Sequence, residues 1–166
     1  MEVNEAKEKF VQSWGSFGSA WGINKTMAQI HALLLTASDP LSTEEVMDYL
    51  KISRGNANMN LRALMDWGLV SKESKLGERK EFFLADKDVW NIARNIVRER
   101  RKKEIEPMIK VLEELKGVEG KDEETETFRN LMEEIDQFAD KADGMLDKFQ
   151  RSDEHWFYKS LLKLLK

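Results

Sequence analysis

The chain has 166 residues, of which 41% are hydrophobic and 35% charged, with a formal net charge of −4 and no cysteine. The missing thiols exclude disulfides, thiolate metal sites and cysteine nucleophiles, and two histidines argue against a histidine-rich metal site. No apolar run approaches the ~18 residues of a membrane span, and the charged N-terminus is unlike a signal peptide, so we expect a mainly helical cytoplasmic protein without membrane, metal or cofactor.

The first part of the chain is expected to form two helices. Over residues 3–21, apolar side chains recur at spacings of three, four or seven, which predicts one apolar helical stripe. Its members are Val3, Phe10, Trp14, Phe17 and Trp21. A second helix is predicted from about Asn24 to Ala37, and Asp39-Pro40 ends it.

A pair of short helices follows. Ser42 and Glu45 have the spacing of a capping box, in which each side chain bonds the other residue's backbone N–H. Ser53 is the next N-cap candidate and begins a helix that runs to about Trp67. Gly68 provides the C-terminal stop. Two short helices with a short connection are typical of a helix-turn-helix.

Two strands, Leu69–Ser74 and Lys80–Leu84, are predicted next, and Gly77 supplies the turn between them. Short helices followed by a hairpin predict a winged helix-turn-helix. We assign it, with the N-terminal helix, to residues 1–86, and a helical dimerisation and effector region to residues 87–166. The expected fold class is therefore mainly α, with a two-stranded wing and long dimerisation helices.

The second half is predicted to be helical. One helix runs from Lys87 to Leu115, with Pro107 kinking or dividing it, and Gly117–Asp122 forms a loop. An apolar heptad seam follows, flanked by Met132, Ala139 and Leu146, and a final amphipathic segment covers His155–Lys166. Because the seam is too apolar to face solvent, we expect a homodimer built by the N-terminal helix and the helices after Lys87. The seam comprises Phe128, Leu131, Ile135, Phe138, Ala142, Met145 and Phe149.

The helix after Ser53 has the chemistry of a DNA-reading element. Ala57, Leu61 and Leu64 share its core side, and Gly55, Asn58, Met59 and Arg62 share the opposite side. Asn can pair with adenine and Arg with guanine, and Met can touch a thymine methyl. On the wing, cationic side chains suit phosphate contact or minor-groove insertion. The predicted DNA-binding residues are Ser53, Arg54, Asn56, Asn58, Met59, Arg62, Lys72, Lys75, Arg79 and Lys80.

A second basic cluster, Arg98–Lys103, lies in the predicted long helix. Residues 87–103 carry seven basic and two acidic side chains, whereas residues 104–166 carry ten basic and seventeen acidic ones. The cluster can flank DNA or pair with the acidic helices of a subunit, and the sequence leaves both alternatives open.

Five aromatic residues admit two interpretations. They can form a cage for a small organic cation through cation–π attraction, or they can simply pack in the core. They are Trp14, Phe17, Trp21, Trp67 and Trp90. No phosphate-binding glycine loop, Ser/His/Asp set or HExxH motif occurs, so we expect no enzymatic activity and assign no catalytic residue.

Several short motifs lie between residues 33 and 90, namely Leu33-Leu34-Leu35, Pro40-Leu41-Ser42, Ser53-Arg54-Gly55-Asn56, Met59-Asn60-Leu61-Arg62, Leu64, Trp67-Gly68-Leu69-Val70, Gly77-Glu78-Arg79-Lys80, Phe83 and Asp88-Val89-Trp90. Through these motifs the chain resembles the GbsR-type branch of the MarR-like winged helix-turn-helix regulators. The similarity implies a dimeric transcriptional regulator, often a repressor, that binds a double-stranded DNA operator. Some members govern uptake or synthesis of glycine betaine and sense choline, which would make the effector an organic cation.

Two functional hypotheses follow. The first is a sequence-specific homodimeric DNA-binding regulator that responds to a small molecule. The second is a winged-helix interaction adaptor of the transcription or chromosome machinery, which would use the hairpin against protein. Asn58, Met59, Arg62 and Arg79 favour the first, because amides and guanidinium groups match base edges and phosphates.

Overall fold

The computed structural model describes residues 1–20, 22–74, 77 and 79–152. The chain divides into two compact units, Met1–Ile92 and Ala93–Lys166. The division falls inside helix α5 (Val89–Arg100), slightly after the boundary expected between residues 86 and 87. Trp21, Lys75 and the amphipathic segment predicted at 155–166 lie outside the described residues.

In the first unit, helices α1 (Val3–Ala20) and α2 (Lys25–Thr36) pack closely through glycine. A Cβ atom on Gly18 would lie 2.6 Å from Cβ of Ala28, which cannot move without its backbone, so glycine permits this approach. Helix α2 confirms the predicted second helix, and Asn24 is its N-cap.

The apolar stripe predicted on α1 does not coincide with the side that packs on α2. Val11 and Gly15 are the buried residues of this helix, whereas Val3 is 65% and Phe17 64% exposed. The expected helix is present, but its small residues determine which side faces the core. The outer side of α1 therefore keeps large apolar groups at the surface of the chain.

Helices α3 (Thr43–Leu50) and α4 (Arg54–Asp66) form the helix-turn-helix. The predicted capping box is confirmed: the Ser42 N–H donates to Oε2 of Glu45 at 2.7 Å, and the Glu45 N–H donates to Oγ of Ser42 at 3.3 Å. Gly68 has a φ of 69°, as expected for the residue that ends a helix in the left-handed conformation.

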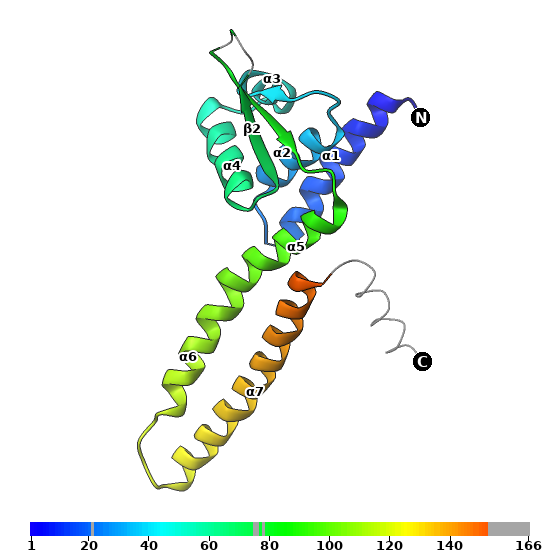
Figure 1. The fold of residues 1–166 in the computed structure, drawn as a ribbon. Helices are drawn as coiled ribbons and strands as arrows, with labels where there is room; N and C mark the ends of the chain where they lie inside the picture. The colour runs from blue at the N-terminus through cyan, green and yellow to red at the C-terminus, as the bar shows by residue number, and fades with distance from the viewer. Residues whose placement is uncertain (21, 75–76, 78, 153–166) are drawn as a thin grey trace, which may run out of the picture. The chain divides into compact units, whose positions relative to one another are not determined.

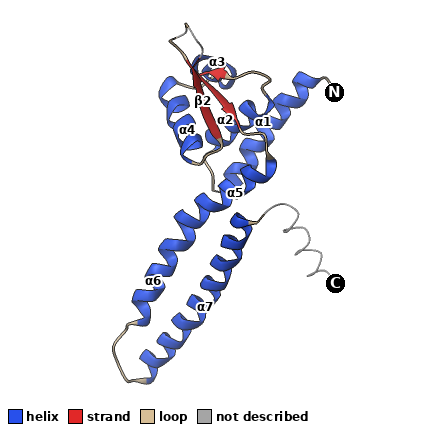
Figure 2. Cartoon of the chain, viewed as in Figure 1, coloured by secondary structure: helices blue, strands red, loops and turns tan. Residues whose placement is uncertain are grey.

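A three-stranded antiparallel sheet completes the first unit, where two strands were expected (Figure 2). Both predicted strands are present as β2 (Val70–Ser74) and β3 (Glu81–Ala85). The additional strand, β1 (Leu41–Ser42), pairs with β3 and places Leu41 opposite Phe83. A two-residue strand has no hydrophobic alternation, so the sequence pattern could not show it.

The core of the first unit lies between α2, α3 and α4. Its largest fully buried side chains are Ile30, Leu34, Val46, Leu61 and Leu64. With the hairpin of β2 and β3 as the wing, this arrangement confirms the predicted winged helix-turn-helix fold.

In the second unit, α5 continues through a π-helical turn, η1 (Arg101–Ile105), into α6 (Glu106–Lys116). Pro107 lacks an N–H, and in a regular α-helix its ring would meet the carbonyl of Lys103. The wider π turn accommodates the ring. The break expected at Pro107 is thus a local widening of a continuous helix.

Helix α7 (Glu123–Arg151) returns antiparallel to α6 and lies beside it along most of its length (Figure 1). The contact buries Leu112 of α6 against Met132 and Ala139 of α7. The predicted heptad seam does not face α6: Phe138 is 74% exposed. The residues expected beside the seam make the contact, and the seam itself lies at the surface of the chain.

Ion pairs explain why α7 turns its acidic side, and not the seam, toward α6. Asp136, which is 7% exposed, pairs with Lys116 of α6. Nη2 of Arg101 donates to Oδ2 of Asp143 at 2.8 Å, and Nη1 donates to Asp147 at 3.3 Å. Because a buried carboxylate without a cation is costly, the acidic stripe of α7 turns toward these cations and the seam turns away. None of the described helices is both long and apolar enough to cross a membrane.

Candidate nucleic-acid interface

Helix α4 presents one polar side and buries the other. Its buried residues are Ala57, Asn60, Leu61 and Leu64. The side predicted to face DNA is exposed at all four expected positions, namely Gly55, Asn58, Met59 and Arg62. Met59 is 58% exposed although it is a large apolar side chain. An apolar group held in water between an amide and a guanidinium suits contact with a base edge.

The first turn of α4 is fixed by its own chain. Oγ of Ser53 accepts a hydrogen bond from the Asn56 N–H at 3.3 Å, as expected for an N-cap. Nη2 of Arg54 donates to Oε1 of Glu44 in α3 at 2.8 Å. The pKa of the Glu44 carboxyl is lowered, first by hydrogen bonding to its own backbone N–H and then by Arg54. Ser53 and Arg54, two of the predicted DNA-binding residues, therefore have hydrogen-bond partners within the chain.

Asn56 is held by a residue that the sequence did not single out. Nδ2 of the buried Asn60 donates to the backbone oxygen of Asn56 at 2.9 Å and to its Oδ1 at 2.7 Å. The carbonyl oxygen of the Asn56 side chain is thereby engaged within the helix. Of the amides in α4, Asn58 is the exposed one, so it is the better candidate for pairing with a base.

The wing carries the remaining predicted contacts. Arg79 and Lys80 are exposed, and Lys75 lies outside the described residues. Nζ of Lys72 pairs with Oε1 of Glu81 on the neighbouring strand at 2.7 Å, so Lys72 is partly neutralised. Gly77, at the turn, has a φ of 84°, a conformation that side chains rarely adopt. Arg79 and Lys80 are therefore the described wing cations best suited to meet phosphate.

The basic cluster at 98–103 is largely paired within the chain. Arg101 pairs with Asp143 and Asp147, and Arg100 pairs with Glu104. Arg101 thus pairs with an acidic helix of its own chain, and contact of the cluster with DNA or with a second subunit stays a prediction. Lys102 and Lys103 are exposed.

The structure does not place the five candidate cage residues in one environment. Trp14 is half-buried, with ring centroids 5.3 Å from Phe10 and 6.5 Å from His31. Phe17 is exposed, Trp67 is buried and Trp90 is half-buried, while Trp21 lies outside the described residues. The four described residues thus range from buried to exposed, and the cage stays a prediction.

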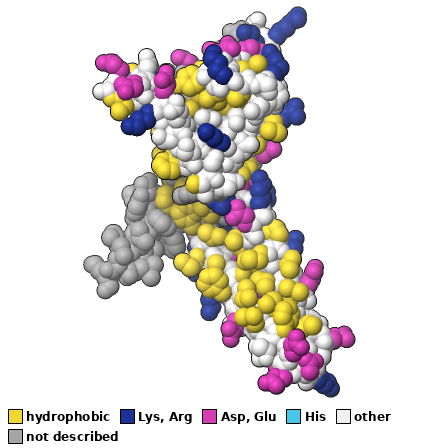
Figure 3. All heavy atoms as spheres, turned by 180° about the vertical axis from the view of Figure 1, so that it is seen from behind, with side chains coloured by type: hydrophobic (Ala, Val, Ile, Leu, Met, Phe, Trp, Pro, Cys, Tyr) yellow, Lys and Arg dark blue, Asp and Glu magenta, His cyan; other side chains and the backbone are white. Residues whose placement is uncertain are grey.

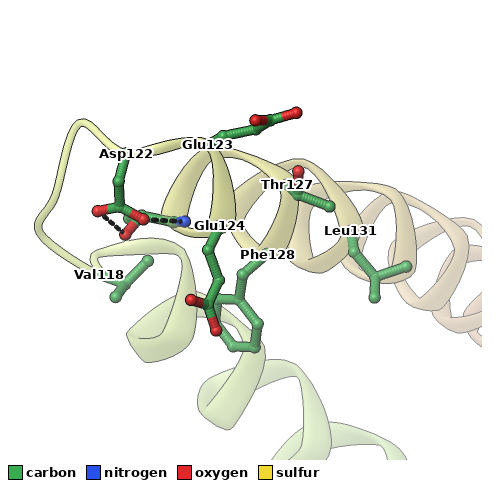
Figure 4. A pocket seen from close by; sticks show the side chains of 8 residues that line it. Val118, Asp122, Glu123, Glu124, Thr127, Phe128 and Leu131 are labelled. Carbon is green, nitrogen blue, oxygen red and sulfur yellow. Dashed lines mark hydrogen bonds between the residues drawn. The ribbon is translucent and has the colours of Figure 1, made fainter.

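The described parts of the chain contain no group of three or more His, Asp or Glu side chains that could hold a metal ion. A hollow at the start of α7 is lined by Val118 of the preceding loop and by Phe128 and Leu131 of the helix (Figure 4). Asp122 closes one end by accepting hydrogen bonds from the N–H and Oγ1 of Thr125. Its apolar wall belongs to the exposed seam of α7.

Comparisons with known proteins agree with this fold. No family model matches the chain. The HTH-type transcriptional repressor GbsR of Bacillus subtilis (strain 168) is 21% identical over 112 residues, which span 68% of this chain and 62% of the repressor. The crystal structure of a transcriptional regulator superposes with a TM-score of 0.55 and 18% identity, covering 86% of this chain and 99% of that one. The chain is thus similar in fold to a transcriptional regulator and in sequence to a repressor.

Proposed function

We propose that this chain is a sequence-specific DNA-binding transcriptional regulator that acts in the cytoplasm as a homodimeric repressor and responds to a small organic cation. The observation that carries the proposal is the exposed side of α4, where Asn58, Met59 and Arg62 lie opposite the core of a winged helix-turn-helix. The similarity to a repressor and to a regulator structure supports it.

In this proposal α4 enters the major groove and the wing contacts the backbone. Arg62 pairs with guanine, Asn58 pairs with adenine, and Met59 packs on a thymine methyl. Arg79 and Lys80 meet phosphates and so fix the register without specifying sequence. Arg54 meets a phosphate only if it leaves Glu44, so we assign it a smaller share of the binding free energy.

Two arginine variants test the division of roles. A duplex enriched from a random-sequence library by the wild-type protein serves as the specific probe, and a scrambled duplex serves as the reference. Arg62→Ala should weaken binding to the enriched duplex by about 1–3 kcal/mol and relax its specificity. Arg79→Ala should weaken both duplexes alike and lower the dependence of affinity on salt. Lys141→Ala, an exposed cation of α7, is the matched control and should change neither.

The alternative, a winged-helix protein adaptor, predicts a different result. In that case the library yields no preferred sequence. A second contrary result is an enriched duplex on which Arg62→Ala lowers affinity by the same factor as on the scrambled duplex. Either outcome would reject base recognition by α4.

The homodimer rests on the apolar side that the second unit exposes. This side is continuous over α6 and α7 and is visible as the gathered hydrophobic side chains of Figure 3. A second copy would cover it by presenting the same surface around a two-fold axis. Its members are Met108, Val111, Leu115, Phe128, Leu131, Ile135, Phe138 and Met145. Two copies present two α4 helices to half-sites about 34–36 Å apart. Light scattering at micromolar concentration should give twice the chain mass, and a monomer would contradict the proposal.

The effector is the remaining part of the proposal. The exposed ring of Phe17 and the half-buried ring of Trp14 could bind a quaternary ammonium group together with Trp21, Trp67 and Trp90. Calorimetry with choline and glycine betaine tests this. Absence of heat with both compounds, with unchanged DNA affinity, would leave core packing as the role of these residues.

A further inference from the structure

Gly55 occupies the second position of α4, at the centre of its exposed side. Asn58 and Met59 lie one turn farther along the same side, and Arg62 lies two turns along. A Cβ atom built on Gly55 meets nothing within 4 Å in the described part of the chain. Its φ is not among the positive values recorded for glycine. Neither packing nor backbone conformation of the free protein therefore requires glycine here.

Other glycines of the first unit have reasons within the chain. A Cβ on Gly18 would clash with Cβ of Ala28, and Gly77 has a φ of 84°. Gly55 lacks both reasons, although glycine weakens a helix by roughly 0.5–1 kcal/mol relative to alanine. Gly144 of α7 lacks them too, but Gly55 lies on the same exposed side as Asn58 and Arg62. On that side, a bare backbone is explained if another molecule must approach the helix more closely than a methyl group allows.

We propose that duplex DNA fills the space next to Gly55, so that the backbone of the first turn of α4 makes the closest approach to the groove. This inference rests on the proposed function and specifies where the recognition helix meets DNA. The N-terminal residues of a recognition helix are those that reach base edges. The polar groups that continue this side, Asn58 and Arg62, have the donors and acceptors that bases and phosphates offer. The side chain of the preceding residue, Arg54, is held by Glu44 of α3.

Gly144 provides a matched control within the same chain. It also lies in an exposed helical position, has no positive φ, and a Cβ there meets nothing within 4 Å of the described residues. It belongs to α7, which has no part in the proposed DNA contact. Gly55→Ala and Gly144→Ala should each raise the melting temperature of the full chain by about 1–3 °C.

The two variants should differ in DNA affinity. Gly55→Ala should bind the duplex enriched by the wild-type protein at least about fivefold more weakly, the equivalent of a lost contact of ~1 kcal/mol. Gly55→Leu should lose more affinity for this duplex than Gly55→Ala, while Gly144→Ala should bind it like the wild type. A loss confined to the enriched duplex places a base edge at Gly55, whereas an equal loss on the scrambled duplex places a phosphate there.

Two outcomes would overturn the inference. One is a Gly55→Ala variant that binds both duplexes within twofold of the wild type. The other is a lower melting temperature of Gly55→Ala, which would show that the free protein itself needs glycine at this position. Failure of the wild-type protein to bind any duplex would instead overturn the proposed function, and the two failures are therefore distinguishable.

Discussion

The two units differ in how completely each one buries its apolar side chains. The winged unit encloses a core in which Ile30, Leu34 and Leu64 are at most 2% exposed. The α6–α7 hairpin buries Leu112, Met132 and Ala139 but leaves Phe138 and Met145 about two-thirds exposed or more. The winged unit thus has a core enclosed by its own chain, whereas among the described residues the α6–α7 pair leaves one apolar side uncovered.

Apolar residues thus have different roles in the two units. In the winged unit most of them form the core that specifies the fold, although Phe17 of α1 and Met59 of α4 stay exposed beside the polar groups of α4 and the wing. In the hairpin, charged contacts such as Lys116 with Asp136 hold the two helices together. The large apolar groups are then free for association, which is the pattern expected of a helix pair that dimerises.

The largest change in free energy is expected on the exposed apolar side of the α6–α7 hairpin. Phe138→Glu places a carboxylate at the most exposed aromatic position of the seam, once in each copy of a symmetric dimer. The free energy of dimer formation should become less favourable by about 3–6 kcal/mol, because burial of two aromatic side chains, at ~1.5–3 kcal/mol each, is lost. Light scattering should show a folded monomer. Gln137→Glu adds the same charge beside the seam and should leave the dimer intact; equal behaviour of the two variants would contradict the proposed interface.

A smaller effect is expected in the closed core of the winged unit. Leu61→Ala leaves a cavity and should lower the free energy of unfolding by about 2–5 kcal/mol. Met59→Ala, two positions earlier on the exposed side of the same helix, should change it by less than about 0.5 kcal/mol. Urea unfolding followed by tryptophan fluorescence measures both. Similar losses for the two variants would show that α4 does not bury the side described here.

Acid should destabilise the winged unit first. Burial lowers the pKa of His31 to about 4 from 6.5, and its Nε2 has no hydrogen-bond partner among the described residues. Because the unfolded chain takes up this proton more readily, stability is lost as the pH falls from 6.5 toward 4, by about 3 kcal/mol. Fluorescence-detected unfolding at several pH values should show this slope in the wild type and lose it in His31→Leu. If the stability of the wild type and of His31→Leu falls in parallel with pH, the role assigned to His31 is wrong.

The smallest effect concerns the charged contact of the hairpin. Hydrogen bonding to Arg101 lowers the pKa of the Asp143 carboxyl. The contribution to stability is therefore present above the ordinary pKa of about 4 and is lost as the pH falls below it. Since the pair is partly exposed, we expect at most about 1 kcal/mol. Acid titration followed by circular dichroism should show an earlier loss of helix in Arg101→Gln than in Lys102→Gln, the exposed neighbour; coincident curves would assign the pair no stabilising role.

Local sequence signals determined much of the candidate interface. Ser42 with Glu45, and Ser53 with Asn56, act over three residues, so the ends of α3 and α4 could be predicted from the sequence. The periodicity of Leu61 and Leu64 likewise predicted the exposed side of α4 correctly. Pairings between elements could not be predicted in this way, and the partner of Arg54, ten residues away on α3, is one example.

The sequence by itself determined the helices, the wing and the apolar seam, because caps, turns and periodicity are properties of residues a few positions apart. Only the tertiary structure decided the rotation of α7, the pairing of β1 with β3 and the packing side of α1. The rotation depends on Asp136 meeting a cation 20 residues away and Asp143 meeting one 42 residues away. Periodicity measures how apolar each side of a helix is. It cannot say which side a distant charge will draw inward, since that depends on the free energy of leaving a buried carboxylate unpaired.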